Sequence, residues 1–173
     1  MSFSIQATIR AFVAPEHRLA CPAPLWGALL EELRRRGQAR TESGAFLLGE
    51  THGKRRHVEA VAYYDDLDPD SLKSGVVVFD GRGYGPLWAL CRETGRSVVA
   101  DVHTHFGEAF QSNLDRNNPM IATAGHVAII VPFLAQGSVQ VADLGVYEYE
   151  GAHRWRDFSG ARASRYFYVG FWG

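Results

Sequence analysis

Two histidines and a serine–aspartate pair stand close together in segment 100–115, directly after an apolar run. His103 and His105 are separated by one residue, and Ser112 and Asp115 are three positions apart. On a β-strand, side chains two residues apart point to the same face, so both imidazoles can reach one point just past the strand's end. On a helix, residues three apart lie on adjacent turns of one face. Because imidazole nitrogens and carboxylate oxygens are zinc ligands, this segment is a candidate metal site.

Each half of this pattern also has an ordinary structural explanation. An isolated His-x-His is more often a pair of solvated surface histidines, and Ser-x-x-Asp is also an N-cap arrangement in which Ser112 caps the helix. A cap and a metal ligand at Asp115 can coexist. The conjunction favours a metal, because two histidines and one carboxylate are three protein ligands and leave one tetrahedral position for water. Zinc lowers the pKa of such a water toward ~7, and a nearby carboxylate should then serve as general base.

The hydrophobic pattern predicts the strands that must position these residues. One continuous apolar run begins beside Glu42 and is typical of a strand buried on both faces, and another ends at the two histidines. The predicted strands are Phe3–Val13, Thr41–Glu50, Val58–Tyr64, Gly75–Phe79, Ser97–His105 and His126–Val131, with a hairpin of Leu144–Glu150 and His153–Phe158.

Helical spacing predicts three helices among these strands. They cover about Leu25–Leu33, ending at Gly37; a stretch after a glycine-rich lead-in, Gly81–Gly85, with Pro86 in its first turn; and about Asn113–Ala124, interrupted near Pro119. Pro15–Pro24 and Asp65–Ser71 are predicted connecting segments. This order predicts an α/β (α+β) fold, with a curved mixed sheet and helices packed on it. The aromatic tail, 161–173, should dock on the body of the protein or on a partner.

The motifs resemble those of the JAB1/MPN/Mov34 (JAMM) metalloenzyme family, in its prokaryotic branch. That family has a glutamate at the start of a buried strand, then His-Ser/Thr-His-Pro, then Ser-x-x-Asp. Here Glu42 opens the sequence ESGAFLLG, which resembles the family's E-x-x-G-x-x-x-G strand. His103-Thr104-His105 and Ser112–Asp115 follow in the family order, and the resemblance covers about Phe3–Phe158.

The resemblance implies a fold and a role for each motif residue. It implies one MPN/JAB-like (cytidine deaminase-like) metalloprotease domain over 1–173, with a curved mixed sheet flanked by helices. His103, His105 and Asp115 would hold zinc. Glu42 would take a proton from the zinc-bound water and pass it to the leaving amine. Ser112 would donate a hydrogen bond to the oxyanion.

The chain departs from the family pattern in the loop after the second histidine. Phe106 replaces the usual proline, and the interval from His105 to Ser112 is one residue shorter than the common spacing. Gly107 could absorb a tighter turn, so the ligands should still converge, while Phe106 and Gly107 would alter the fit of the substrate.

Two further residues near the motif could support the site. Asp101 lies two residues before His103, on the same strand face, and could orient that imidazole from behind; the alternative is simple solvent exposure. His126 opens a buried strand, which favours a structural role over a role as ligand.

Family members with an intact motif cleave after the C-terminal glycine of ubiquitin or ubiquitin-like proteins. The stretch His103–Ser159 is similar to bacterial members encoded with ubiquitin-activating (E1-like) and ubiquitin-conjugating (E2-like) homologues in antiphage defence. The resemblance therefore implies a zinc isopeptidase that deconjugates or matures a ubiquitin-like protein, with E1-like and E2-like proteins as further partners. A non-catalytic MPN scaffold and a zinc hydrolase of small amino-acid conjugates are the alternatives.

Composition limits the other classes of function. The chain has 173 residues, which predicts a single domain, and 18 Lys+Arg against 19 Asp+Glu. This balance argues against nucleic acid or an anionic membrane as partner. Two cysteines imply no disulfide framework, and the first residues carry no signal-peptide pattern, so the expected location is cytoplasmic.

Overall fold

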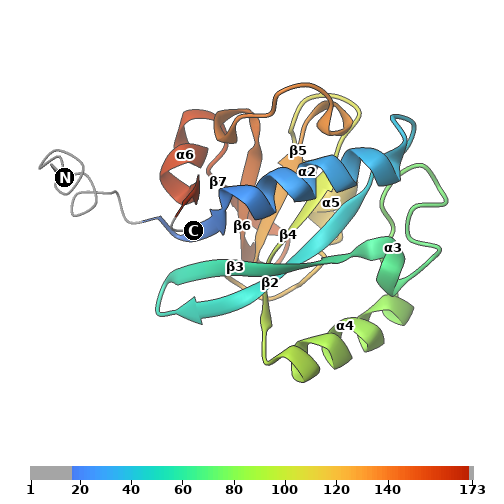
Figure 1. The fold of residues 1–173 in the computed structure, drawn as a ribbon, viewed down its shortest axis with the longest axis horizontal. Helices are drawn as coiled ribbons and strands as arrows, with labels where there is room; N and C mark the ends of the chain where they lie inside the picture. Colours follow the sequence, from blue (N-terminus) through green and yellow to red (C-terminus); the bar gives the residue numbers. More distant parts are fainter. Residues whose placement is uncertain (1–16, 172–173) are drawn as a thin grey trace, which may run out of the picture.

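One curled, mixed β-sheet of eight strands runs through the protein, with helices on both of its faces (Figure 1). The computed structural model describes residues 17–171, so the predicted strand Phe3–Val13 lies outside the described residues. Across the sheet the strand order is β7-β6-β5-β4-β2-β3-β1-β8. The strands are β1 (Leu19–Pro22), β2 (Gly44–His52), β3 (Arg55–Tyr63), β4 (Ser97–Thr104), β5 (Val127–Val131), β6 (Gly145–Gly151), β7 (Arg154–Asp157) and β8 (Phe167–Gly170).

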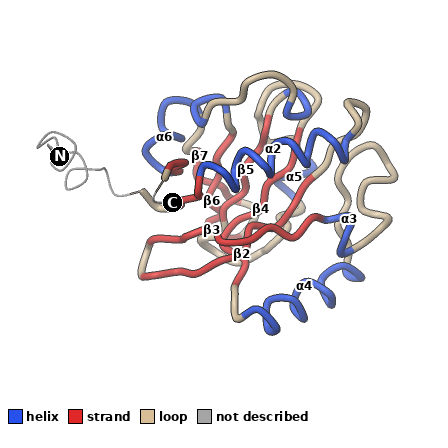
Figure 2. Tube along the Cα trace, in the orientation of Figure 1, coloured by secondary structure: helices blue, strands red, loops and turns tan. Residues whose placement is uncertain are grey.

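The predicted mixed sheet is confirmed by the directions of its strands. β4 lies between β2, to which it is antiparallel, and β5, to which it is parallel. β6 and β7 form the predicted antiparallel hairpin, while β1 is parallel to both β3 and β8. The helices are α2 (Ala23–Gly37), α3 (Tyr64–Leu67), α4 (Gly81–Thr94), α5 (Asn113–Asn117) and α6 (Ala163–Tyr166), with 3-10 turns at Phe133–Ala135, Val141–Asp143 and Gly160–Arg162 (Figure 2).

Strand β2 is apolar throughout its first half because both of its faces are covered. Ala45 and Leu47 belong to the core cluster that includes residues of α2, whereas Phe46 and Leu48 belong to the cluster that includes Leu87 of α4. Successive side chains of a strand point to opposite faces, so each of these helices covers one face of β2. The prediction of a strand buried on both faces is confirmed.

Helix α2 is confirmed with its predicted stop. Trp26, Leu29 and Leu33 are buried on one stripe, and the helix ends at Gly37, followed by Gln38 in the left-handed conformation.

None of the described helices is both long and apolar enough to cross a membrane.

The glycine-rich stretch 81–85 is part of α4, and the prediction of a lead-in before the helix is wrong. The Asp80 carboxylate accepts a hydrogen bond from the Arg82 N–H at 2.9 Å and caps the helix at Gly81. Gly83 packs against Phe79 so closely that a Cβ there would lie 2.3 Å from the ring. Pro86 consequently lies inside the helix and not in its first turn.

Two other predicted elements are wrong for local reasons. Gly75–Phe79 is no strand, because its backbone N–H groups bond to the Ser71 carbonyl and the Glu42 carboxylate and not to a neighbouring strand. The helix predicted over Asn113–Ala124 stops at Asn117. Pro119 disfavours helical backbone at the residue before it, which is Asn118. The predicted connectors also contain short elements, namely β1 and α3.

The C-terminal segment docks on the body of the protein, as predicted, over its described part. Ala163, Tyr166 and Phe167 are buried, and β8 adds to the sheet beside β1. The Phe167 ring packs edge-on against Trp26 with ring centroids 4.9 Å apart. The tail therefore joins the core on the face covered by α2.

Candidate metal centre

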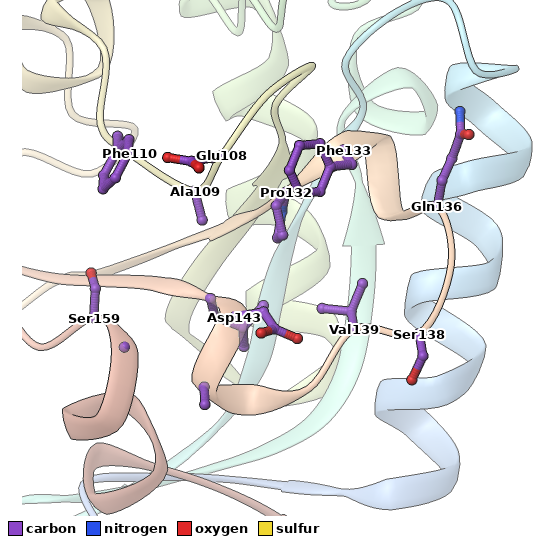
Figure 3. A pocket seen from close by; sticks show the side chains of 13 residues that line it. Glu108, Ala109, Phe110, Pro132, Phe133, Gln136, Ser138, Val139, Asp143 and Ser159 are labelled. Atoms are coloured by element: carbon purple, nitrogen blue, oxygen red, sulfur yellow. The ribbon is translucent and has the colours of Figure 1, made fainter.

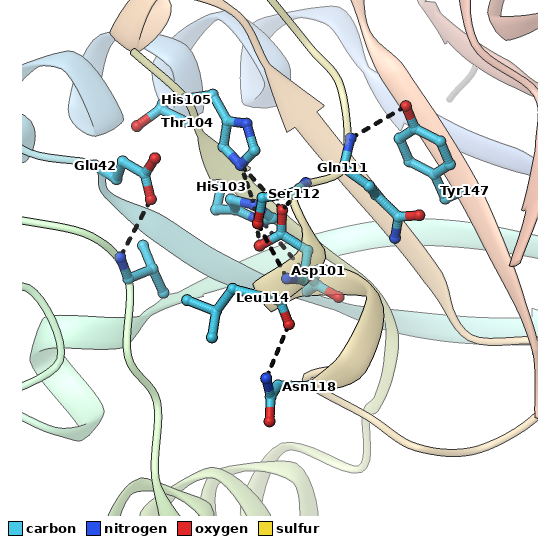
Figure 4. Close-up of polar contacts among 12 residues, drawn as sticks. Glu42, Asp101, His103, Thr104, His105, Gln111, Ser112, Leu114, Asn118 and Tyr147 are labelled. Atoms are coloured by element: carbon cyan, nitrogen blue, oxygen red, sulfur yellow. Dashed lines mark hydrogen bonds and ion pairs between the residues drawn. The ribbon is translucent and has the colours of Figure 1, made fainter. Parts of the chain in front are cut away.

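His103 and His105 lie at the end of β4, with their side chains on the same face of the sheet. His103 is a buried residue of the strand, and His105 is the first residue after the strand ends. Between them Thr104 points to the other face, where its hydroxyl accepts a hydrogen bond from the Ser43 N–H at 2.9 Å. The two imidazoles therefore converge, with their Nε2 atoms 3.0 Å apart (Figure 4).

Asp115 reaches the same point from helix α5. Its Oδ1 lies 3.5 Å from His103 Nε2, and its Oδ2 lies 3.3 Å from His105 Nε2. The Ser112 N–H donates to Asp115 Oδ2 at 2.7 Å, and the Asp115 N–H donates to Ser112 Oγ at 3.2 Å. This reciprocal capping box fixes the carboxylate while leaving it beside the imidazoles. The helix cap and the cluster of ligand atoms therefore coexist at Asp115.

The spacing and chemistry of these three side chains suit a divalent cation. Two ligand atoms that each lie ~2.0–2.1 Å from a tetrahedral ion are about 3.3 Å apart. The separations of 3.0, 3.3 and 3.5 Å bracket this value. Among the described residues, His103, His105 and Asp115 form the group whose ligand atoms could hold a metal, and the predicted convergence is confirmed as geometry.

Charge is concentrated in this cluster. Burial opposes the charged form of His103, but the Asp101 and Asp115 carboxylates beside it outweigh that effect and raise the pKa of His103 to about 10. Burial also opposes the charged form of Asp115 and by itself would raise the pKa of its carboxyl. The neighbouring His103 and His105 instead hold that pKa well below its usual range. A cation would replace the proton on His103, since the neutral imidazole is the metal-binding form.

Asp101 is buried directly behind His103, so the alternative of solvent exposure is wrong. It is 1% exposed, and its Oδ2 lies 3.8 Å from His103 Nδ1. That distance is longer than a hydrogen bond, and His103 Nδ1 is buried with no hydrogen-bond partner among the described residues. The carboxylate stands where it could receive the Nδ1–H of a metal-bound imidazole after a small movement.

Two residues that the motif did not indicate hold Asp101 in place. His126 Nε2 lies 2.5 Å from Asp101 Oδ1, and the Tyr64 hydroxyl donates to Asp101 Oδ2 at 3.3 Å. His126 is buried, and its structural role agrees with the expectation from the sequence. The link to Asp101 depends on the parallel pairing of β4 with β5, which the sequence pattern does not reveal.

Glu42 lies at the same end of the sheet but is not one of the clustered ligands. In the antiparallel pairing of β2 and β4, Gly44 is opposite His103, and the Thr104 N–H donates to the Ser43 carbonyl at 2.9 Å. This pairing brings Glu42 to the side of His105, where Figure 4 shows its carboxylate. Its Oε2 accepts a hydrogen bond from the Val77 N–H at 3.3 Å.

The loop after His105 is shaped by an unusual turn elsewhere in the chain. Gly107 has no positive φ, so it does not use the conformational freedom expected of it. Positive φ values occur instead at Phe133, Leu134 and Ala135, at 52°, 54° and 58°. The Leu134 N–H donates to the His105 carbonyl at 2.8 Å, and the Phe133 N–H donates to the Gly107 carbonyl at 2.9 Å. The turn 133–135, with its sparsely populated backbone conformation, therefore fixes the start of the loop 106–111. We call this loop, which joins His105 to Ser112, the metal loop.

Exposed apolar side chains occur in the segments next to the cluster. Val76, Val78, Phe106 and Leu114, which we call the apolar rim, are between 37% and 53% exposed. A cavity of about 380 Å³ lies beside this rim and includes Asp115 in its wall. Its other lining residues are Val77, Val78, Phe79, Tyr84, Leu114, Asn118, Pro119 and Met120. Exposed apolar groups gathered at one place are typical of a binding surface.

A second cavity, of about 480 Å³, is lined by part of the loop after His105 but by none of the candidate ligands. Its walls come from residues 108–110 of that loop, the turn after β5, the segment 138–144 and residues 159–160 (Figure 3). In this view Val139 and Asp143 extend into the space. It contains no histidine, so we assign the candidate chemistry to the cluster at the end of β4.

Comparisons with known proteins support the fold alone. No family model matches the sequence. The solution structure of a protein from Desulfitobacterium hafniense, a structural genomics target, is similar with a TM-score of 0.58. The match covers 82% of this chain and 90% of that one at 19% identity.

Proposed function

We propose that this protein is a zinc-dependent peptidase or isopeptidase of the JAB1/MPN/Mov34 type, with the MPN-like fold that this implies. One observation carries the proposal. The His103 and His105 Nε2 atoms and the Asp115 carboxylate converge at the end of β4, and the Glu42 carboxylate stands at the same end of the neighbouring strand. Zinc suits this donor set of two imidazoles and one carboxylate, with one position left open.

Zinc bound at this cluster would polarise a carbonyl group and make water a nucleophile near neutral pH. Glu42 would accept the proton of that water and pass it to the leaving nitrogen. The Val77 N–H donates to one oxygen of its carboxylate, and the carboxylate lies on the side of His105 (Figure 4).

Ser112 is exposed and carries a hydroxyl beside the cluster. Its Oγ accepts the Asp115 N–H, so the hydroxyl hydrogen is not used in the capping box. It can donate to the oxygen on which negative charge develops during attack on the carbonyl. The capping box and this role again coexist in one residue.

The surface around the cluster supports a polypeptide substrate over a small amino-acid conjugate. Val78 and Leu114 of the apolar rim are exposed, and both line the cavity that has Asp115 in its wall. They give an extended chain apolar surface to cover next to the scissile bond. We therefore propose a ubiquitin-like protein or its conjugates as substrate, with E1-like and E2-like proteins as partners in the same pathway.

Cleavage of a linear fusion of ubiquitin to a reporter protein tests the proposal. Glu42→Gln should lower kcat by at least about 100-fold, because it removes the proton acceptor while leaving the three ligands in place. Glu50→Gln changes an exposed glutamate of β2, the strand that follows Glu42; it is the matched control and should cleave at the wild-type rate. Equal rates for wild type and Glu42→Gln would refute the mechanism.

A further inference from the structure

Strand β6 lies against the loop that joins the histidines to the capping box. Gly145 and Tyr147, two residues apart on β6, both meet Ala109 of this loop. A Cβ on Gly145 would lie 2.1 Å from the Ala109 carbonyl oxygen, so only glycine allows the loop to approach here. The Tyr147 hydroxyl donates to the same carbonyl at 3.2 Å and accepts the Gln111 N–H at 3.4 Å (Figure 4).

These contacts complete a set of attachments along the loop. The Leu134 and Phe133 N–H groups hold the carbonyls of His105 and Gly107 at its start. Tyr147 holds its end, at Gln111, which is directly followed by Ser112 of the capping box. The position of Asp115 therefore depends on where this end of the loop is fixed.

We propose that Tyr147 is a positioning residue for the metal centre, because its hydroxyl ties Ala109 and Gln111 to β6 and so places the Asp115 carboxylate against the two imidazoles. Tyr147 is 7% exposed, so water does not readily replace this hydroxyl. Metal ligands must be held within about 0.5 Å of their working geometry by such supporting contacts. The inference rests on the proposed metal site and not on the identity of the substrate.

Tyr149 offers a matched control on the same strand and the same face. It is 5% exposed, and its hydroxyl accepts the His153 N–H at 3.1 Å in the turn between β6 and β7. Tyr147→Phe and Tyr149→Phe each remove one hydroxyl from a buried tyrosine. Only the first hydroxyl contacts the metal loop, so a merely structural role predicts similar behaviour of the two variants.

The experiment measures the zinc dissociation constant of the full chain by competition with a chromogenic chelator. We expect Tyr147→Phe to weaken zinc binding about tenfold and Tyr149→Phe to stay within about twofold of wild type. The visible spectrum of the cobalt-substituted protein is a second readout, and it should change in Tyr147→Phe alone.

The outcomes separate this inference from the proposed function. If wild type binds zinc and Tyr147→Phe matches Tyr149→Phe in both affinity and cobalt spectrum, the positioning role is overturned while the metal centre stands. If wild type binds no zinc, the metal centre and the positioning role are both overturned. A weakened, spectrally altered centre in Tyr147→Phe alone supports both.

Discussion

At the scale of single residues, the candidate site is a set of charges that hold one another. Asp115 lies between the two imidazoles and Asp101 lies behind one of them. His126 and Tyr64 in turn hold the buried Asp101 carboxylate. Burying a carboxylate is costly unless it is paired, so this arrangement is explained best if His103 works as a ligand that needs a fixed orientation.

Replacement of Asp101 by asparagine should therefore weaken zinc binding. Asp101→Asn keeps the size of the side chain but removes the negative charge that faces His103 Nδ1, and we expect affinity to fall on the order of ten- to a hundredfold. Chelator competition measures the loss. Asp143→Asn, at an exposed capping residue, is the control and should bind zinc as wild type does. Unchanged affinity in Asp101→Asn would show that the carboxylate does not support the ligand.

The candidate ligands and Asp101 behind them were predictable from residue types and spacing, whereas the residues that hold Asp101 and the loop after His105 were not. His103, His105 and Asp115 follow one another in a local pattern, and the structure brings them together as expected. Tyr147 lies on β6 and His126 directly precedes β5, and the pairing of β5 with β4 and of β6 with β5 is a long-range property. No residue spacing in the sequence predicts this strand pairing.

At the scale of elements, the buried strands were predictable and the segments around them less so. β2 and β4 are covered on both faces, so their apolar runs are unambiguous. α4 and α5 depart from prediction because their limits depend on single contacts. The Asp80 cap begins α4 before its glycines, and Pro119 ends α5 early. The segment Gly75–Phe79 departs because its hydrogen bonds go to Glu42 and Ser71.

Two helical glycines should respond oppositely to alanine. Gly83→Ala in α4 places a methyl group against the buried Phe79 ring, and we expect it to lower the free energy of unfolding by ~1–3 kcal/mol. Gly27→Ala, at an exposed position inside α2, meets open space and should raise it by ~0.5–1 kcal/mol, because alanine is the better helix former. Urea denaturation measures both. If Gly83→Ala stabilises the protein as much as Gly27→Ala does, the close packing against Phe79 is not present in solution.

At the scale of the whole molecule, the candidate site lies at the end of β4, a strand in the middle of the sheet. Strand β4 is flanked by β2, which contributes to the cores on both faces, and by β5, which leads to the hairpin and to Tyr147. The described part of the C-terminal segment forms the sheet edge β8 beside β1, with β2, β3 and β1 between it and β4. A metal bound at the cluster would connect β4 to α5, a helix of five residues.

The zinc content of the purified protein tests the central claim most directly. After incubation with zinc and removal of unbound metal, elemental analysis should find about one zinc per chain in wild type and almost none in His103→Ala. His52→Ala, which changes an exposed histidine of β2, should retain the wild-type content. A wild-type protein without zinc, or a His103→Ala variant that holds as much zinc as wild type, would contradict the account.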